Sequence, residues 1–120
     1  MILADSSVWI DYLNKGDALF NRVLVEQLVL LHPFVIGELA LGSMKSRKAQ
    51  LRYLKLLPQA DEATDTEVIA LIENSALYCT GIGYIDAHLL ASAKISGVDF
   101  WTRDKRLHQA AVRLGLTRLH

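Results

Sequence analysis

The sequence has few of the residues that cross-link or stiffen a chain. Its 120 residues include one cysteine, Cys79, and two prolines, Pro33 and Pro58. A lone cysteine excludes an internal disulfide and a zinc site built from cysteines, and it is typical of a reducing compartment. Hydrophobic residues make up 52% of the chain, enough for a core without such cross-links. The length predicts a single domain spanning residues 1–120.

An excess of charge and a long hydrophobic run are also missing. Thirteen basic and thirteen acidic side chains cancel, so any binding of nucleic acid would need a local patch of positive charge. The first residues lack the basic start and apolar stretch of a signal peptide. The most apolar region, 28–41, is interrupted by polar residues, Gly37 and Pro33. We therefore expect no membrane segment and a cytoplasmic protein.

Apolar segments of strand type alternate with segments of helix type along the chain. Strands are predicted at 2–4, 28–31, 98–102 and 116–119. Helices are predicted from Ser6 or Ser7 to the break at Gly16, and over 35–41, 46–57, 64–76, 84–96 and 104–114. The helix at 64 begins with a capping-box pattern, Thr64 followed by Glu67. This alternation indicates an α/β fold with a parallel sheet and helices on both faces.

Four acidic residues are the strongest functional signal: Asp5, Glu38, Asp86 and Asp104. Asp5 and Asp104 follow predicted strands, and the carboxyl ends of parallel strands border the crevice where α/β proteins bind ligands. Glu38 and Asp86 lie in apolar helical segments, where an acid is seldom buried unless it is paired or bound. If the four converge, their repulsion favours proton uptake or a hard divalent cation such as Mg²⁺ or Mn²⁺. Such a cation can activate water for hydrolysis of a phosphate ester.

Each acid also has a purely structural explanation. Asp5 and Asp104 can serve as helix N-caps, Asp86 lies in the first turn of a helix where the dipole favours an acid, and Glu38 can be exposed on a surface helix. Three hydroxyl groups lie close to these acids in the sequence: those of Ser6, Ser7 and Thr102. They can orient Asp5 and Asp104, hold water at a metal, or simply cap helices and stabilise turns.

The segments that carry these acids resemble the PIN domain, and specifically the VapC-type toxins of bacterial toxin–antitoxin systems. The segments are Asp5–Asp11, Gly37–Leu39 with Gly42, Asp86–Ala91 and Thr102–Asp104, and the resemblance covers nearly the whole chain. It implies a three-layer α/β/α fold with a central parallel sheet of four to five strands. It also implies an endoribonuclease that depends on Mg²⁺ or Mn²⁺ and cleaves RNA with metal-activated water. The implied partners are a VapB-type antitoxin, with its C-terminal segment in or near the active groove, and a second copy of the chain.

The resemblance also assigns roles to individual residues. It makes Asp5, Glu38, Asp86 and Asp104 the metal-binding and catalytic acids, and it makes Thr102 the catalytic hydroxyl. Some relatives carry a further acid shortly after the last one, but here Lys105, Arg106 and Leu107 follow Asp104. We therefore expect one metal site in preference to two.

Two functions of other classes stay open at this point. A receiver-like signalling domain also binds Mg²⁺ at the end of a parallel sheet, but it needs paired acids after its first strand, where Asp5 has serine neighbours. A non-catalytic binding module of the same fold would not need intact acids at all four positions. The basic residues of the 46–57 segment can follow an RNA backbone, meet an acidic antitoxin segment, or form a solvated face. Trp9 and Phe34 are either core residues or candidates for lining an antitoxin groove, and Cys79 is expected in the core.

Overall fold

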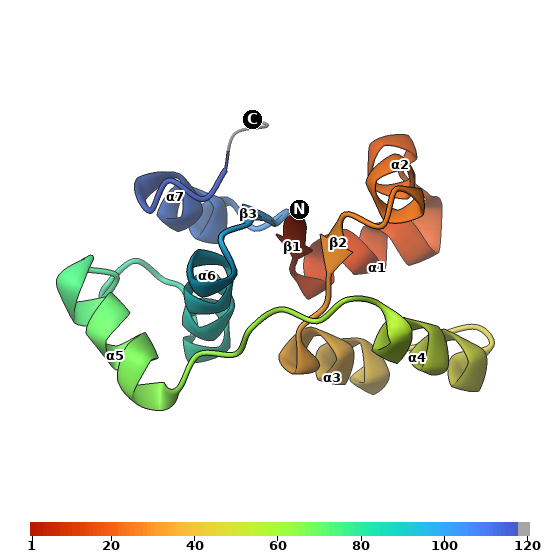
Figure 1. The fold of residues 1–120 in the computed structure, drawn as a ribbon, viewed down its shortest axis with the longest axis horizontal. Coiled ribbons are helices and arrows are strands. Elements are labelled where there is room, and N and C mark those ends of the chain that lie inside the picture. Colours follow the sequence, from red (N-terminus) through yellow and green to blue (C-terminus); the bar gives the residue numbers. More distant parts are fainter. Residues whose placement is uncertain (118–120) are drawn as a thin grey trace.

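A computed structural model describes residues 1–117 of the 120 and gives three strands and seven helices in that part (Figure 1). The strands are β1 (Ile2–Ala4), β2 (Val29–Leu30) and β3 (Asp99–Trp101). The helices are α1 (Ser6–Lys15), α2 (Ala18–Val25), α3 (Pro33–Leu41), α4 (Arg47–Leu56), α5 (Asp65–Asn74), α6 (Tyr84–Ser96) and α7 (Lys105–Arg113). None of these helices has the length and apolar character needed to cross a bilayer.

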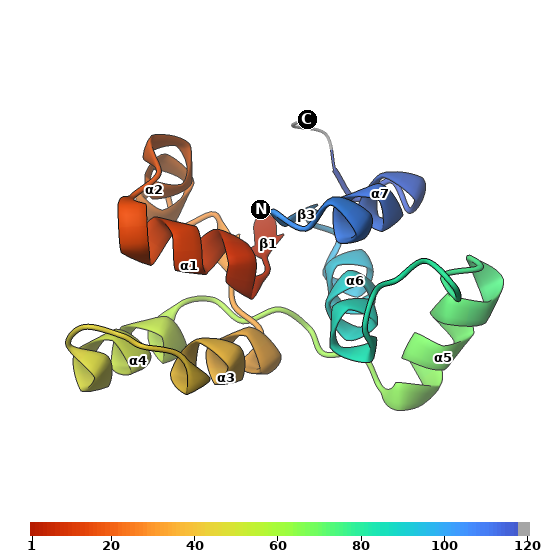
Figure 2. The same ribbon diagram turned by 180° about the vertical axis from the view of Figure 1, so that it is seen from behind.

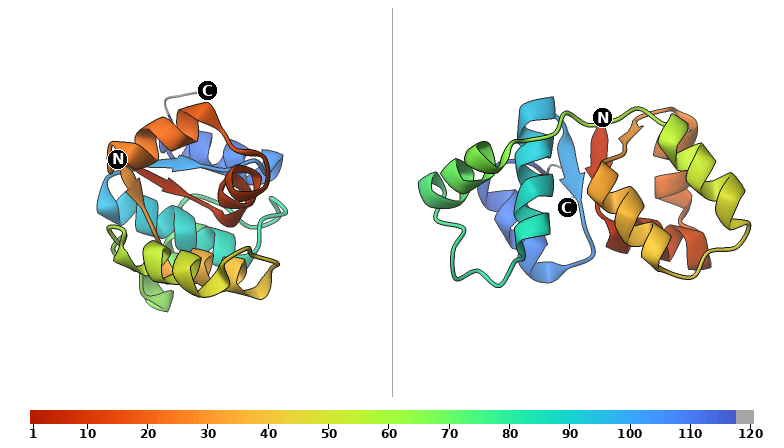
Figure 3. Two further views of the ribbon diagram at one scale, coloured as in Figure 1. Left: turned by 90° about the vertical axis from the view of Figure 1, so that its right-hand side faces the viewer. Right: turned by 90° about the horizontal axis from the view of Figure 1, so that it is seen from below.

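The three strands form one parallel sheet in the order β2-β1-β3. Leu3 of β1 lies opposite Leu30 on one side and Phe100 on the other. Because all the strands run the same way, the residues that follow them share one edge of the sheet. Figures 1 and 2 show the sheet between two groups of helices, with α1 to α4 on one side and α5 to α7 on the other. The link after α4 crosses from the first group to the second (Figure 3).

The prediction of a four- to five-stranded sheet is wrong for the part of the chain that is described, where the sheet has three strands. Both edges show pairing that stops early. At the β2 edge, Gln59 makes an isolated parallel bridge with Leu31 directly after Pro58, which has no N–H to donate. At the β3 edge, the Phe100 N–H donates to the Leu116 carbonyl at 2.6 Å, but residues 116 and 117 form no strand. Residues 118 and 119 of the predicted last strand lie outside the described residues.

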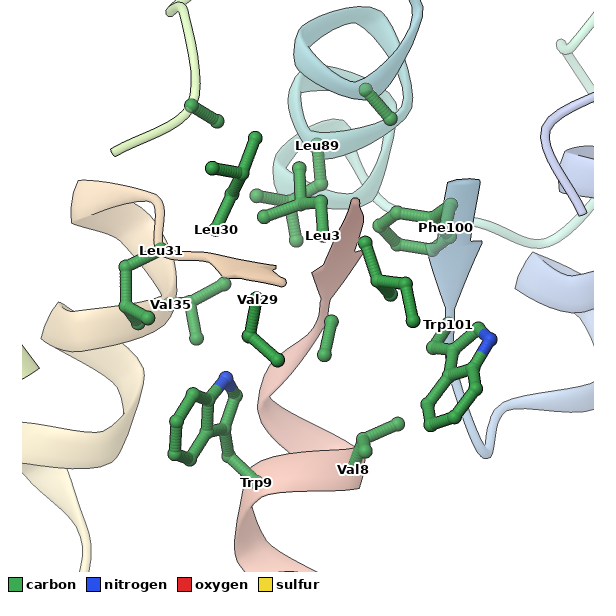
Figure 4. Packing of buried hydrophobic residues seen from close by; sticks show 14 of the residues in the cluster. Leu3, Val8, Trp9, Val29, Leu30, Leu31, Val35, Leu89, Phe100 and Trp101 are labelled. Atoms are coloured by element: carbon green, nitrogen blue, oxygen red, sulfur yellow. The ribbon is translucent and has the colours of Figure 1, made fainter. Parts of the chain in front are cut away.

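The core is built on both faces of this sheet. Leu3 lies beside Leu89 of α6 on one face, and Val29 lies toward Trp9 of α1 on the other (Figure 4). All four side chains are almost fully buried, with at most 1% of each exposed. Helices on both faces explain why the strands are apolar at every position except Asp99, which begins β3. This packing holds the carboxyl ends of the strands rigidly in place.

Several helices begin at a side chain that accepts backbone N–H groups. Thr64 and Glu67 form the predicted capping box of α5, with bonds of 3.1 and 2.9 Å. Asp17 caps α2 through the Phe20 N–H, and His32 caps α3 through the Phe34 N–H. The sequence interpretation treated Gly16 and Asp17 only as a break, so it missed α2. The signal was present, because an Asp followed by an amphipathic stretch is typical of a helix start.

Of the two alternatives for Trp9, core or groove lining, the structure gives the core, whereas the expectation for Cys79 is wrong. Trp9 is 1% exposed and packs edge-to-face on Phe20 with ring centroids 4.9 Å apart, so it belongs to the core and lines no groove. Cys79, expected in the core, is exposed and has a positive φ of 60° in the turn before α6. Phe34 is half-buried between the rings of His32 and His88. Only its outer part remains accessible to a partner.

Candidate active site

Asp5 lies at the centre of the carboxyl edge of the sheet, and the folded chain buries it. It directly follows β1, it is 6% exposed, and it caps α1 by accepting the backbone N–H groups of Ser7 and Val8 at 3.1 and 3.4 Å. Burial raises the pKa of its carboxyl group, and the negative charge of Asp86 adds to that rise. Hydrogen bonds from Ser7, Thr102 and Val8 act the other way. Asp5 is therefore both a helix cap and a buried carboxylate.

Two hydroxyl groups fix the orientation of this carboxylate. Oγ of Ser7 donates to Oδ1 of Asp5 at 2.5 Å, and Oγ1 of Thr102 donates to Oδ2 at 2.6 Å. Ser7 Oγ also accepts the Arg103 N–H at 2.9 Å, which ties the loop after β3 to the start of α1. The expectation that hydroxyl groups orient Asp5 is confirmed for Ser7 and Thr102. Both oxygens of Asp5 are thus held by groups from two ends of the chain.

Glu38 and Asp86 approach Asp5 from the two helical groups. Glu38 lies on α3 and is exposed, whereas Asp86 lies in the first turn of α6 and is half-buried. Partial burial raises the pKa of Glu38, and the charges of Asp86 and Asp5 raise it further, against a hydrogen bond from Ser6. Oδ2 of Asp86 accepts the Gly83 N–H at 2.9 Å. The fold therefore brings three of the four expected acids into electrostatic contact.

Asp104 is held differently. Its Oδ1 accepts the Leu107 N–H at 3.0 Å and caps α7, and its own N–H donates to Thr102 Oγ1 at 3.0 Å. It is exposed on the loop before α7. Asp104 is therefore joined to Asp5 through the hydroxyl group of Thr102.

The chemistry of these side chains fits a hard divalent cation. Within residues 1–117, no Lys, Arg or His forms an ion pair with Asp5, Glu38, Asp86 or Asp104. In the same region, no three acidic, histidine or cysteine side chains form a ready-made metal cage. Mg²⁺ does not need one, because it is commonly held by one or two carboxylates and keeps several waters. The three coupled acids meet that requirement.

Arg103 of the loop after β3 forms ion pairs with acids of the first two helical segments. Its guanidinium group pairs with Asp17 at 2.6 Å and with Asp11 at 3.4 Å. The hydrogen bond that the Phe20 N–H makes to Asp17 lowers the pKa of Asp17, and Arg103 lowers it further. Spacing alone could not reveal this link, because Asp17 and Arg103 are 86 positions apart. It joins the start of α2 to the loop that carries Thr102 and Asp104.

Two hollows flank the acids. One of about 420 Å³ lies beside Thr102 and Asp104, and it is also lined by Leu19, Trp101 and Lys105. The other, of about 380 Å³, lies beside Glu38 between α1 and the α3–α4 connection. Both volumes fall in the range of roughly 300–1,000 Å³ that is usual for small-molecule sites. The acids therefore lie between two spaces that a larger ligand can enter.

Comparison with known proteins places this geometry in a family. The family model described as the PIN domain matches residues 2–113. Two curated relatives from Mycobacterium tuberculosis strains, CDC 1551 / Oshkosh and H37Rv, are both named Ribonuclease VapC32. Each is 44% identical over 117 residues, which is 97% of this chain and 94% of the relative. The chain is a PIN-domain protein of the VapC type. This assignment replaces the receiver-like alternative.

The fold of this PIN domain also occurs in a solved structure. The crystal structure of FitAcB from Neisseria gonorrhoeae contains a chain that aligns with a TM-score of 0.63, covering 93% of this chain and 94% of that one. The identity is 23%, so the likeness supports the fold alone. It agrees with an α/β arrangement around a parallel sheet.

Proposed function

We propose that this protein is a divalent-metal-dependent endoribonuclease that acts as the toxin of a VapBC-type pair. The observation that carries the proposal is the electrostatic coupling of Asp5, Glu38 and Asp86 at the carboxyl edge of the sheet, without an ion-pair partner within residues 1–117. Neighbouring negative charges that raise the pKa values of Asp5 and Glu38 are costly unless a cation neutralises them. The relatives named as ribonucleases supply the class of substrate.

Each residue has a distinct role in this proposal. Asp5, Glu38 and Asp86 would hold the cation, and Asp104 would complete the acidic edge. A bound Mg²⁺ would supply charge neutralisation at the phosphate and a water of lowered pKa. Thr102 and Ser7 keep both oxygens of Asp5 in one orientation, which preserves the position of the site when substrate enters.

The proposal is tested by cleavage of RNA with purified protein. The wild type should cut RNA in the presence of Mg²⁺ and lose this activity in EDTA. Asp86→Asn should lower the rate at least about 100-fold, because it removes a charge that the transition state needs. Glu73→Gln, an exposed acid on α5, is the matched control and should leave the rate unchanged. Equal cleavage by Asp86→Asn and wild type would contradict the role of Asp86, and a wild type that cuts no RNA in Mg²⁺ would favour the non-catalytic binding module.

The mechanism has its own test. Attack by water does not use the 2′-hydroxyl next to the scissile phosphate, so a substrate with one 2′-deoxy position there should still be cut. A substrate of this kind that binds but resists cleavage would contradict attack by water. Mapping of RNA 5′ ends after brief expression of wild type and Asp86→Asn would then identify the cellular RNA.

The antitoxin is the proposed protein partner. The hollow beside Glu38 has an apolar lining from Ile10, Leu13 and Leu39, and Ile10 is 46% exposed. A peptide segment that fills this hollow would bury these side chains and reach the acidic edge at Glu38. Ile10→Asp should weaken binding of the cognate antitoxin and leave RNA cleavage intact. Association of two copies, which the resemblance implies, remains a prediction that sedimentation analysis can check.

A further inference from the structure

We infer that the hollow between β3, α7 and the start of α2 binds the nucleotide next to the scissile phosphate. Its apolar wall would contact the base, and Lys105 would contact the backbone phosphate of that nucleotide. The inference rests on the proposed ribonuclease function and adds to it a subsite that determines substrate preference.

The hollow is continuous with the acidic edge. Thr102 lines the hollow and also donates a hydrogen bond to the buried Asp5 at 2.6 Å. Asp104 lines the hollow as well. If the scissile phosphate of an RNA strand lies at Asp5, the nucleotide attached to that phosphate must lie directly beside Asp5. This space of about 420 Å³ lies at that position and can accept a base and its ribose.

The wall of the hollow has the character of a base-binding surface. Val8 and Trp101 form a floor that is 2% and 6% exposed, and Leu19 rises beside it with 52% of its surface exposed. Leu19 lies on α2, where an amphipathic helix would normally turn such a side chain inward. A flat apolar base set against Leu19 and the floor would remove this surface from water. Contact with an apolar wall tolerates any base but favours the one that fits best.

Positive charge lies where the backbone would pass. Lys105 is exposed at the start of α7 and has no ion-pair partner within the described chain. The other guanidinium or ammonium group at the hollow, that of Arg103, is already paired with Asp17, which cancels both charges. Lys105 is therefore the lysine or arginine side chain of the hollow that no ion pair within residues 1–117 engages, and the exposed Asp104 carboxylate lines the same hollow. A phosphate diester is the anion that an RNA strand presents to such a lysine.

The experiment measures binding without cleavage. Nucleoside 5′-monophosphates of the four bases are titrated into metal-free protein and followed by NMR at the Leu19 methyl groups and the Trp101 indole N–H. Both signals should shift, and Lys105→Gln should weaken binding about fivefold because one charge-assisted contact is lost. Lys94→Gln, an exposed lysine in the last turn of α6, is the matched control and should bind like wild type. Ribose 5-phosphate should bind more weakly than any nucleotide.

The outcomes separate this inference from the proposed function, because neither metal nor cleavage is needed. Unmoved Leu19 and Trp101 signals would overturn it, as would equal binding by Lys105→Gln and wild type. Equal affinity for ribose 5-phosphate and nucleotides would contradict the inference that the apolar wall contacts the base. Signals that shift with the antitoxin and with no nucleotide would overturn the inference and assign the hollow to the protein partner.

In cleavage assays, Leu19→Ala should raise KM, keep kcat unchanged and reduce the base preference at one position beside the cleavage site.

Discussion

The Thr102 hydroxyl connects two of the acids: it donates to Oδ2 of Asp5 at 2.6 Å and accepts the Asp104 N–H at 3.0 Å. Removing this single oxygen leaves a buried carboxylate with one bond fewer and an N–H without its acceptor. Both losses occur at the proposed active edge, so they should affect folding and catalysis together.

Thr102→Val keeps the shape of the side chain and removes the hydroxyl group. It should lower the free energy of unfolding by about 1–2 kcal/mol, since two hydrogen bonds at a partly buried site are lost. It should also slow RNA cleavage, because Asp5 is no longer held at Oδ2. Thr102→Ser restores the hydroxyl and should recover most of both properties. Urea unfolding and cleavage rates measure the two effects, and equal losses in Val and Ser variants would contradict this role.

Acidification should stabilise the metal-free protein through Asp5 and Glu38. Their pKa values are raised in the folded state above the ordinary values of 3.8 and 4.5. Their ionisation therefore costs stability as the pH rises through the raised values, and protonation restores it as the pH falls toward the ordinary ones. Asp86→Asn removes one cause of both shifts. At pH 7 without metal, it should be more stable than wild type by about 0.5–1 kcal/mol, the upper part of the range for charge pairs at the surface of a protein.

Thermal unfolding across pH 4 to 8 in EDTA tests this relationship. The advantage of Asp86→Asn should shrink toward pH 4, where Asp5 and Glu38 take up protons in the wild type. Glu73→Gln controls for the loss of any negative charge. An advantage that grows on acidification would show that the coupling has the opposite sign.

Magnesium should reverse the order of stability. A ligand that binds only the folded state stabilises it by about 2.7 kcal/mol at one hundred times its Kd. The wild type should therefore unfold several degrees higher in saturating Mg²⁺, while Asp86→Asn and Glu38→Gln should gain little. Potassium chloride at equal ionic strength controls for screening of the acids. The same gain in wild type and both variants would place the cation elsewhere.

The ion pair of Arg103 with Asp17 should contribute modestly to stability. The two side chains are 47% and 26% exposed, and pairs at such positions are worth about 0.5–1 kcal/mol. Asp17→Asn keeps the cap on the Phe20 N–H and removes the charge, so it isolates the pair. A double-mutant cycle with Arg103→Met gives the coupling energy, which should fall in 1 M salt. A coupling that does not depend on salt would point to a loss of packing instead.

Local chemistry made part of the fold predictable. Thr64 and Glu67 define the start of α5 by a pattern four residues long, and Gly97 ends α6 with a φ of 68°, which suits a residue without a Cβ. Asp5 and Asp104 follow the strands as expected, because an apolar run and a polar residue after it are both visible in the sequence.

Other features depend on distant partners and could not be predicted in this way. Gln59 pairs with Leu31 for a single bridge, and the length of that pairing depends on where the whole link after α4 runs. Cys79 is apolar by type, yet its turn lies at the surface. Asp5 and Asp104 each cap a helix, and the structure links them through Thr102. That all four acids serve the metal remains a prediction, because a sequence does not reveal whether a capping acid also faces a ligand.

Asp5 caps the start of α1 as well as facing the proposed cation, whereas no backbone N–H within residues 1–117 donates a hydrogen bond to the exposed Glu38 carboxylate. Under growth selection for cells that escape the toxin, changes at these two codons should then differ in kind. Escape through Asp5→Ala would leave a protein that has lost a helix cap and is degraded, while escape through Glu38→Ala would leave abundant, folded and inactive chains. The folded, inactive Glu38→Ala chains would still bind the antitoxin. In cells that also make active toxin, they would therefore compete for the antitoxin and leave active toxin unbound.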